Sequence, residues 1–292
     1  MSVTLLQAWT GARDRLKTAG VDSPVIDARL LVEAAAGATR LDLITDPYRA
    51  LSDDQAATLE AYVARRERRE PVARILGRKG FWKIMLQVGP AVLIPRPDTE
   101  TVLDVVLAAF EEQRRFQVLD LGVGSGAILL AILAERPNAV GLGIDISEEA
   151  LAVARDNAAR LGLEGRAAFL RGDWAEGLGD ESFDLVVSNP PYIPSETIET
   201  LDPEVRDHEP RLALDGGADG LDAYRALAPE ILRVLRPGGV FAVEIGWDQA
   251  EAVTAVLQAA GAQAVRIVKD LALRDRVATG VKKPLGIAPP SR

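Results

Sequence analysis

The spacing of apolar residues changes character twice along the chain. Over residues 1–70 these residues recur at the three- or four-residue interval of one helix face, beginning with Leu5, Trp9, Ala12 and Leu16. Ser52 and Gln55 stand at the spacing of a capping box ahead of the helical run "AATLEAYVARR". Between residues 71 and 97, glycines and prolines interrupt short apolar runs such as "FWKIMLQV", which favours a β-hairpin.

From residue 98 onward, apolar runs of strand length alternate with amphipathic helical patterns. The runs "QVLDLG", "AVGLGIDI", "AAFLRGD", "FDLVVSN" and "VFAVEIG" predict strands, and "AVRIVKDLALRDRVATG" predicts two more with no helix between them. Ser147 and Gly162 fit the two ends of the helix "SEEALAVARDNAARLG". This alternation is typical of an α/β fold with a mostly parallel, doubly wound sheet, here of seven strands with an antiparallel edge hairpin.

The patterns therefore predict four segments. Residues 1–70 form a small helical domain, and residues 71–97 form a β-hairpin linker. Residues 98–283 form the α/β domain, and residues 284–292, "PLGIAPPSR", form a flexible tail.

Composition narrows the chemistry that this fold can carry. With 48% hydrophobic and 26% charged residues, the chain resembles an ordinary soluble protein. The absence of cysteine excludes disulfides and thiolate metal sites, and His208 is the only histidine. We therefore expect no bound metal and no histidine-based catalysis. The chain begins without the pattern of a signal peptide and contains no uncharged stretch of about 18 residues, so we expect a cytoplasmic protein without a membrane span.

The charge balance argues against a nucleic-acid substrate. A net charge of -9 disfavours broad contact with phosphate backbones, which requires clustered lysine and arginine. One basic cluster does occur between Glu60 and Lys83, where it includes Arg65, Arg66 and Arg69. Two interpretations remain open for it: a solvated helix face, or a docking patch for an acidic or RNA-rich partner.

A glycine-rich segment, "DLGVGSG", follows the first predicted strand of the sheet. Glycine lets the backbone turn sharply and approach a ligand, and the helix that follows offers unpaired N–H groups. The spacing is not that of a dinucleotide fingerprint, and the lysine of a P-loop is missing. We expect this loop to bind a cofactor through Gly122, Val123, Gly124, Ser125 and Gly126.

Two further strand ends complete this cofactor site. Asp145 ends the next strand at the interval at which a carboxylate reaches ribose hydroxyls. Trp174, beside Asp173, offers a ring that could pack on adenine, although an ordinary core position is the alternative. The combination favours an adenosine-type ligand without a pyrophosphate, and S-adenosylmethionine is the leading candidate. A helix-capping turn with a solvated aspartate is the alternative.

The fourth strand ends in "SNPPYI", which predicts the catalytic site. Proline has no N–H and restricts the residue before it, so nearby carbonyl oxygens stay free and fixed in direction. The Asn189 side-chain oxygen and the Pro190 carbonyl could both accept hydrogen bonds from one substrate NH2 group, while Pro191 adjoins them and Tyr192 stacks on a planar group. Such acceptors would return electron density to an amide or nucleobase nitrogen and aim it at a methyl group.

These motifs resemble class I S-adenosylmethionine-dependent methyltransferases that modify an amide or exocyclic nitrogen. "VLIPRPDTE", "EPRLALDGGADGLDAYR", "LRPGGVFAVEIGWDQ" and "RDRVATG" resemble, more narrowly, the HemK/PrmC family, over residues 70 to 280. The resemblance implies methylation of N5 of the glutamine in the Gly-Gly-Gln motif of class-1 peptide chain release factors. It implies cofactor contacts from the Gly122–Gly126 loop, Asp145, Trp174 and Asn189, and substrate contacts from Asn189, Pro190, Pro191 and Tyr192.

The resemblance extends to the partner. It implies that the helical domain docks the release factor, and we expect a monomer. The stretch Arg96-Pro97-Asp98 matches the family near its partner interface, with a turn and helix N-cap as the alternative. Val123 and Gly80 depart from the family, which more often has a threonine and an acidic residue there.

Three further interpretations concern the loop and the activity. The acidic segment from Pro194 to Leu221 is predicted to help cover the glutamine pocket. An adenine-N6 DNA or RNA methyltransferase is the alternative activity, because "NPPY" also suits adenine. A second alternative, which is not an enzyme, is a catalytically silent cofactor-binding or ribosome-associated module.

Overall fold

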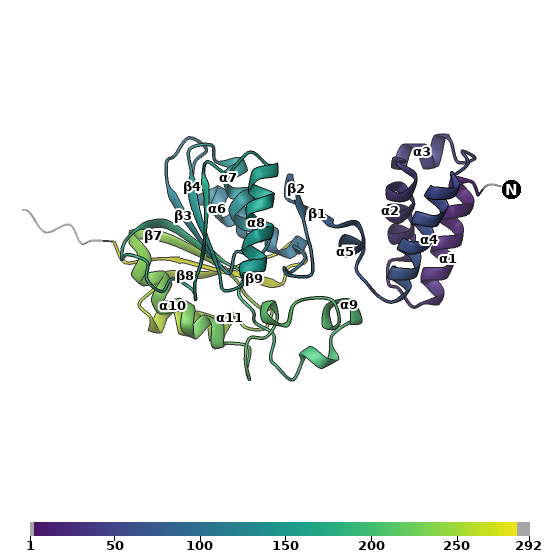
Figure 1. The fold of residues 1–292 in the computed structure, drawn as a ribbon. Coiled ribbons are helices and arrows are strands. Elements are labelled where there is room, and N and C mark those ends of the chain that lie inside the picture. The colour runs from purple at the N-terminus through teal and green to yellow at the C-terminus, as the bar shows by residue number, and fades with distance from the viewer. Residues whose placement is uncertain (1–2, 285–292) are drawn as a thin grey trace, which may run out of the picture. The chain divides into compact units, whose positions relative to one another are not determined.

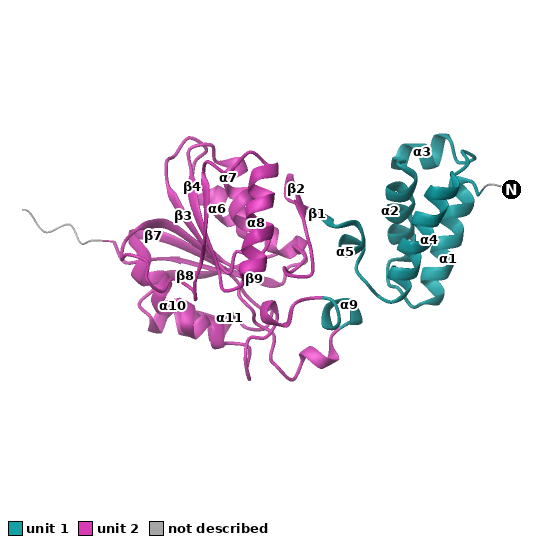
Figure 2. Cartoon of the chain, viewed as in Figure 1, with its two compact units in different colours: residues 1–78, 202–208 teal, residues 79–201, 209–292 magenta. Residues whose placement is uncertain are grey.

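A computed structural model describes residues 3–284, which form two compact units. Figure 2 shows that unit 1 runs to Arg78 and also contains Asp202–His208, while unit 2 contains Lys79–Leu201 and the chain from Glu209 onward. The predicted tail, residues 284–292, lies outside the described residues apart from Pro284. None of the helices within residues 3–284 has the length and apolar character needed to cross a bilayer.

Unit 1 is helical, as the spacing of its apolar residues predicted. Its main helices are α1 (Leu5–Thr18), α2 (Pro24–Ala36), α3 (Arg40–Thr45), α4 (Asp53–Glu67) and α5 (Val72–Leu76). The predicted capping box is confirmed: the Ser52 hydroxyl accepts from the Gln55 N–H, and the Gln55 side chain accepts from the Ser52 N–H. Apolar side chains of α1, α2 and α4 form the core of this unit.

Unit 2 is built on a seven-stranded sheet in the order β5-β4-β3-β6-β7-β9-β8. The strands are β3 (Gln117–Leu121), β4 (Val140–Asp145), β5 (Ala167–Arg171), β6 (Phe183–Ser188), β7 (Leu235–Glu244), β8 (Gln263–Lys269) and β9 (Asp275–Val281). All neighbours are parallel except β9, which is antiparallel to both β7 and β8. The predicted sheet with its antiparallel hairpin is therefore confirmed.

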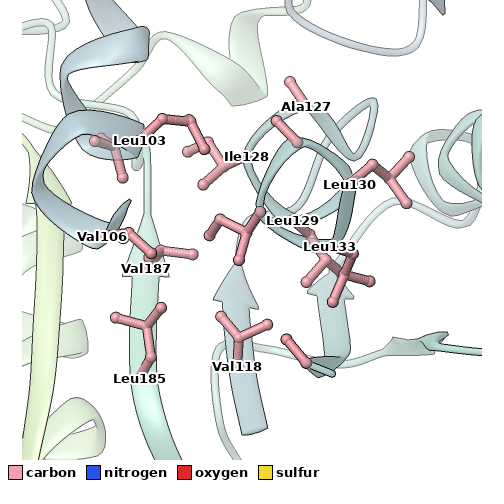
Figure 3. Packing of buried hydrophobic residues seen from close by; sticks show 14 of the residues in the cluster. Leu103, Val106, Val118, Ala127, Ile128, Leu129, Leu130, Leu133, Leu185 and Val187 are labelled. Atoms are coloured by element: carbon pink, nitrogen blue, oxygen red, sulfur yellow. The ribbon is translucent and has the colours of Figure 1, made fainter. Parts of the chain in front are cut away.

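Helices cover both faces of this sheet (Figure 1). The helices α6 (Glu100–Ala109), α7 (Ala127–Glu135) and α8 (Glu148–Arg160) contribute to one core, and α10 (Asp222–Val234) and α11 (Ala250–Ala259) contribute to the other. Alternate strand residues serve opposite faces: Val118 belongs to the first core and Leu119 to the second. Figure 3 shows Leu103 and Val106 of α6 beside side chains of α7 and of β6.

A small two-stranded sheet, β1 (Arg78–Phe81) and β2 (Ile84–Gln87), precedes the main sheet. Phe81, Ile84 and Leu86 join the first core of unit 2. The side chain of Asn157 on α8 bonds both backbone groups of Gln87, at 2.7 and 3.0 Å. The hairpin is thereby fixed to α8 and to the first core of unit 2.

The acidic segment after β6 carries short helical turns. These are η2 (Ile198–Thr200), α9 (Pro203–Arg206) and η3 (Arg211–Ala213). A further turn, η1 (Pro97–Thr99), leads into α6. Both η1 and η3 contribute to the cavity described next.

Candidate active site

The carboxyl ends of three neighbouring strands meet at one cavity. Leu121 at the end of β3 pairs with Ser188 at the end of β6, and the Ser188 hydroxyl donates to the Leu121 carbonyl at 2.7 Å. The N–H groups of Gly122 and Val123 donate to the Ile144 carbonyl near the end of β4. From β3 the chain continues to β4 and β5 on one side of the sheet, and it then crosses to β6 on the other side of β3. This reversal of strand order is the switch point at which open α/β sheets bind ligands. The cavity encloses about 460 Å³.

The glycine loop follows β3 along one wall of the cavity. Gly122, Gly124 and Gly126 have φ of 73°, 52° and 84°, a region that other residues rarely adopt. A Cβ on Gly126 would also lie 2.8 Å from a Leu130 side-chain carbon. Of the five predicted loop residues, four line the cavity, and the fifth, Gly126, is the N-cap residue of α7 and is not among the lining residues.

Val123 is buried in this loop, at the position where the family more often has threonine. One of its methyl carbons lies 2.7 Å from where a Cβ of Gly143 would stand. Gly143 therefore leaves space on β4 that the Val123 side chain fills. The methyl group contributes packing where a hydroxyl is missing.

Asp145 ties the loop to β4. Its Oδ2 accepts from the Gly124 N–H at 2.9 Å, and its Oδ1 accepts from the Ser147 N–H at 3.0 Å. Ser147 caps α8, as predicted, by accepting from the Ala150 N–H. Asp145 lines the cavity, and each carboxylate oxygen keeps a lone pair for a ligand hydroxyl.

Trp174 and Asp173 lie beside the glycine loop. Both line the cavity, and a Cβ on Gly122 would be 3.8 Å from the Trp174 ring. Trp174 has a φ of 48°, so the backbone makes a left-handed turn after β5. The ring is half-buried and also contacts the second core, so it combines a core position with an exposed cavity wall.

Asp120 is a cavity residue to which the sequence interpretation assigned no role. It is buried, its Oδ2 accepts from the Leu129 N–H at 3.1 Å, and its Oδ1 has no hydrogen-bond partner within residues 3–284. Burial raises the pKa of Asp120 to about 7. An unpartnered buried oxygen beside a glycine loop is a feature that a polar ligand would satisfy. The charged residue inside the apolar run "VLDLG" was the available signal.

The strand end "SNPPY" contributes two residues to the cavity lining, Asn189 and Pro191. The Asn189 Nδ2 donates to the Thr99 hydroxyl at 3.2 Å, which leaves its Oδ1 as an acceptor. Pro190 is buried and is not among the lining residues. Tyr192 is not among them either, and its hydroxyl donates to Glu244 Oε1 at 3.1 Å.

Glu244 was also missed. It ends β7 inside the apolar run "FAVEIG", and it is only 1% exposed. Burial raises the pKa of Glu244 to about 7, while the side chains of Thr99 and Tyr192 and the charge of Arg276 act in the opposite direction. A carboxyl group in a strand otherwise made of apolar residues was the signal for it.

Glu209 holds together the part of the cavity wall that contains Arg96 and the residues after Glu209. Its buried carboxylate pairs with Arg96 at 2.8 Å and accepts from the Ile94 N–H at 3.2 Å. Pro210, Leu212 and Ala213, which follow it, line the cavity with Arg96. Part of the segment predicted to cover the pocket therefore forms its wall.

The neighbouring Asp98 does not cap a helix. It pairs with Arg276 at 3.3 Å, and η1 has no side-chain cap at its first residue. The motifs "RPD" and "RDR" are thus joined in space.

Tyr192 is held from behind by close backbone contacts. Gln249 Nε2 donates to the carbonyls of Tyr192 and Gly220, at 3.0 and 3.2 Å. A Cβ on Gly216 would lie 2.8 Å from Tyr192 Cα. Ile193 then pairs with Asp215 as an isolated parallel bridge. The segment "DGGADGLDAYR" therefore supports the strand end that carries Asn189.

Three arginines of the basic cluster are paired with carboxylates within unit 1. Arg65 pairs with Glu70, and Arg66 pairs with Asp27. Arg66 and Arg69 both bind the carboxylate of Glu204, at 2.9 and 2.6 Å. These arginines stabilise the unit rather than form an open cationic surface.

This sheet order, with a glycine loop, an acidic second strand end and "NPPY" around one cavity, defines the class of S-adenosylmethionine-dependent methyltransferases. Residues 7–77 match the family described as the PrmC N-terminal domain, and residues 112–273 match a methyltransferase domain family. The release factor glutamine methyltransferase of Caulobacter vibrioides is 68% identical over 98% of this chain and 99% of its own length. The chain belongs to the release factor glutamine methyltransferase family.

Other comparisons agree with this assignment. The release factor glutamine methyltransferase of Rhodospirillum rubrum is 50% identical, over 94% of this chain and 84% of its own. Among solved structures, a methyltransferase from Pyrococcus furiosus superimposes with a TM-score of 0.52 at 19% identity, covering 68% of this chain and 88% of its own. At that identity the likeness concerns the fold alone. The protein is an enzyme that uses S-adenosylmethionine.

Proposed function

We propose that the protein methylates the side-chain amide nitrogen of the glutamine in the Gly-Gly-Gln motif of class-1 peptide chain release factors. The observation that carries the proposal is Asn189, whose Nδ2 is engaged by Thr99 so that its Oδ1 is left as an acceptor at the cavity. A glutamine NH2 offers two donors, which match Oδ1 of Asn189 and the Pro190 carbonyl.

These acceptors address the weak nucleophilicity of an amide. The nitrogen lone pair is delocalised into the carbonyl, which makes it a poor nucleophile. Two oriented acceptors draw electron density to the nitrogen and direct its lone pair toward the cofactor end of the cavity. The N–CH3 bond would form as the S–CH3 bond of the bound cofactor breaks and leaves its electron pair on sulfur, and the amide proton would then leave to solvent.

S-adenosylmethionine, when bound, supplies a methyl group on a positively charged sulfur. We assign its ribose to Asp145, whose oxygens keep free lone pairs, and its adenine to the wall formed by Trp174. The loop from Gly122 to Gly126 holds the rest of the cofactor through its backbone, as its left-handed glycines allow a close approach. We place the substrate glutamine beside Pro191, which lines the cavity, and we propose that Tyr192, which follows it in the chain, stacks on the amide once the substrate is bound.

The helical unit is proposed as the docking element for the release factor. Apolar side chains are exposed at one part of it: Leu41 and Ile44 on α3, and Tyr48 after it, at 64%, 69% and 77%. Clustered exposed apolar residues of this kind are typical of protein interfaces. We further propose that the enzyme acts as a monomer in the cytoplasm, where its substrate works.

Methyl transfer from labelled S-adenosylmethionine tests the activity. An unmodified class-1 release factor should take up label, and its Gln→Ala variant in the Gly-Gly-Gln motif should not. Duplex DNA and RNA serve as controls. Label on nucleic acid would support an adenine methyltransferase instead, and cofactor binding without transfer would support a silent binding module.

A further inference from the structure

We propose that Thr99 is a positioning residue for methyl transfer, because it fixes which end of the Asn189 amide faces the substrate. The inference rests on the proposed function, since it requires Asn189 to act as an acceptor. Thr99 is 3% exposed and lies at the end of η1, ninety residues before Asn189 in the chain.

The need for such a residue follows from the shape of an amide. The oxygen and the NH2 group of asparagine are similar in size, and a half-turn about the last side-chain bond exchanges them. The wrong orientation would present a donor to the NH2 group of glutamine. In the structure, the Asn189 Nδ2 donates to the Thr99 hydroxyl at 3.2 Å, which selects the orientation with Oδ1 at the cavity.

A hydroxyl alone could not make this selection, because it can either donate or accept. Glu244 removes that freedom. An ionised carboxylate only accepts, so a Thr99 hydroxyl that donates to Glu244 keeps its lone pairs for Asn189. The same carboxylate already accepts from the Tyr192 hydroxyl at 3.1 Å. Above its raised pKa of about 7, the buried Glu244 carboxylate thus sets the direction of both hydroxyls.

The surroundings of Glu244 support this direction. The Thr99 side chain lowers the pKa of Glu244. Within residues 3–284, Glu244 Oε2 has no hydrogen-bond partner. The oxygen is therefore available to the Thr99 proton. Arg276, whose side chain is almost buried and which pairs with Asp98 and Asp270, supplies a positive charge that favours the ionised form.

The Thr99 hydroxyl does not cap the helix that follows it. Thr99 occupies the position before α6 where a threonine side chain usually caps the helix, but it makes no cap hydrogen bond. The hydroxyl accepts from Asn189 instead, and the Thr99 side chain lowers the pKa of Glu244. We therefore assign the hydroxyl to the site.

A double-mutant cycle tests the assignment, with kcat measured at saturating cofactor and release factor. Thr99→Val should lower kcat by about tenfold to a hundredfold, the effect of losing one oriented hydrogen bond. Thr99→Ser should restore most of the rate, and the Kd for S-adenosylmethionine should stay within about twofold. In an Asn189→Ala background, Thr99→Val should have no further effect, because the group it positions is gone.

Thr279→Val is the matched control. Thr279 is equally buried, and its hydroxyl donates to the Phe241 carbonyl at 2.7 Å between β9 and β7. Its loss should lower stability and leave kcat unchanged. An unchanged kcat in Thr99→Val, or an equal loss with and without Asn189, would overturn the positioning role. A normal rate for Asn189→Ala alone would overturn the acceptor role in the proposed function, and this inference with it.

Discussion

At the scale of single residues, Glu244 and Asp120 make the stability of the folded protein depend on pH. Each is a buried carboxyl group whose pKa is raised to about 7, from ordinary values of 4.5 and 3.8. In the unfolded chain both groups lose their protons at those lower values. Between about pH 4 and pH 7 the folded protein therefore binds more protons, so these groups make it less stable as pH rises.

Glu244→Gln should remove one of these contributions. Replacing an ionisable group by a neutral one abolishes its proton release, so the variant should lose less stability than the wild type between pH 5 and pH 8. The difference at the upper end is roughly 3 kcal/mol, from the change in pKa. Urea unfolding at several pH values measures it. A wild-type-minus-variant difference that stays constant with pH would contradict the expectation.

Asn189 should dominate the rate of transfer. We expect Asn189→Ala to lower kcat by about 10²–10³ without unfolding the protein, because one preorganised acceptor is lost. Single-turnover transfer to a release factor measures this. Asn138→Ala is the control, since Asn138 is exposed and bonds Gln113 far from the cavity. Near-normal turnover in Asn189→Ala would refute the acceptor role.

Asp145 should affect cofactor affinity more than the chemical step. Asp145→Ala removes the proposed ribose acceptor and leaves the N–H groups of Gly124 and Ser147 without their partner. Losing hydrogen bonds to a charged group should raise the Kd for S-adenosylmethionine by about tenfold to a hundredfold. Calorimetry measures the Kd, with Asp156→Ala on the solvent side of α8 as the control. Equal Kd values for both variants and the wild type would show that the ribose assignment is wrong.

At the scale of elements, the segment behind Tyr192 depends on glycine. A Cβ on Gly216 would stand 2.8 Å from Tyr192 Cα and 2.9 Å from Gly220 Cα, and backbone atoms cannot rotate away as a side chain can. Gly216→Ala should therefore displace the strand end that carries Asn189. We expect about 1–3 kcal/mol of lost stability and a lower kcat.

Gly165→Ala is the matched control for this element. Nothing lies within 4 Å of a Cβ at Gly165, and its φ is not in the left-handed region. Thermal unfolding and methyl transfer should be close to wild type for this variant. Equal behaviour of the two alanine variants would contradict the close packing behind Tyr192.

Elements that follow a local rule could be predicted from the sequence. The Ser52 capping box, the start of α8 at Ser147 and the seven strands depend on residues close together in the chain. The glycine loop and "NPPY" were found in the same way. Thr99, Glu209 and Glu244 were missed because their roles come from contacts with distant segments, which periodicity does not report.

At the scale of the whole molecule, the proposed docking role of the helical unit can be separated from chemistry. Tyr48→Asp places a charge among the exposed apolar residues of α3 and the turn after it. We expect the KM for an intact release factor to rise by about tenfold, with kcat nearly unchanged, because a central aromatic contact is lost. A short peptide with the Gly-Gly-Gln motif should be methylated equally by variant and wild type.

Leu271→Asp is the control for this substitution, since Leu271 is a fully exposed apolar residue in the turn between β8 and β9. A KM that rises for the peptide as strongly as for the intact factor would show that Tyr48 acts on the catalytic site. An unchanged KM for both would assign docking to another surface.

The course of the chain between the two units limits how this enzyme can be divided. Residues 202–208 lie between two stretches of unit 2, yet they belong to unit 1, where Glu204 binds Arg66 and Arg69. The polypeptide therefore passes from one unit to the other three times. No single cut of the chain therefore yields two complete units. A fragment that ends at Arg78 lacks Glu204, the carboxylate that pairs with Arg66 and Arg69, and the remaining fragment has Glu204 without those arginines. The unit proposed to dock the release factor and the methyltransferase unit are therefore interleaved along one chain, so neither can be removed by trimming one terminus without leaving part of it behind.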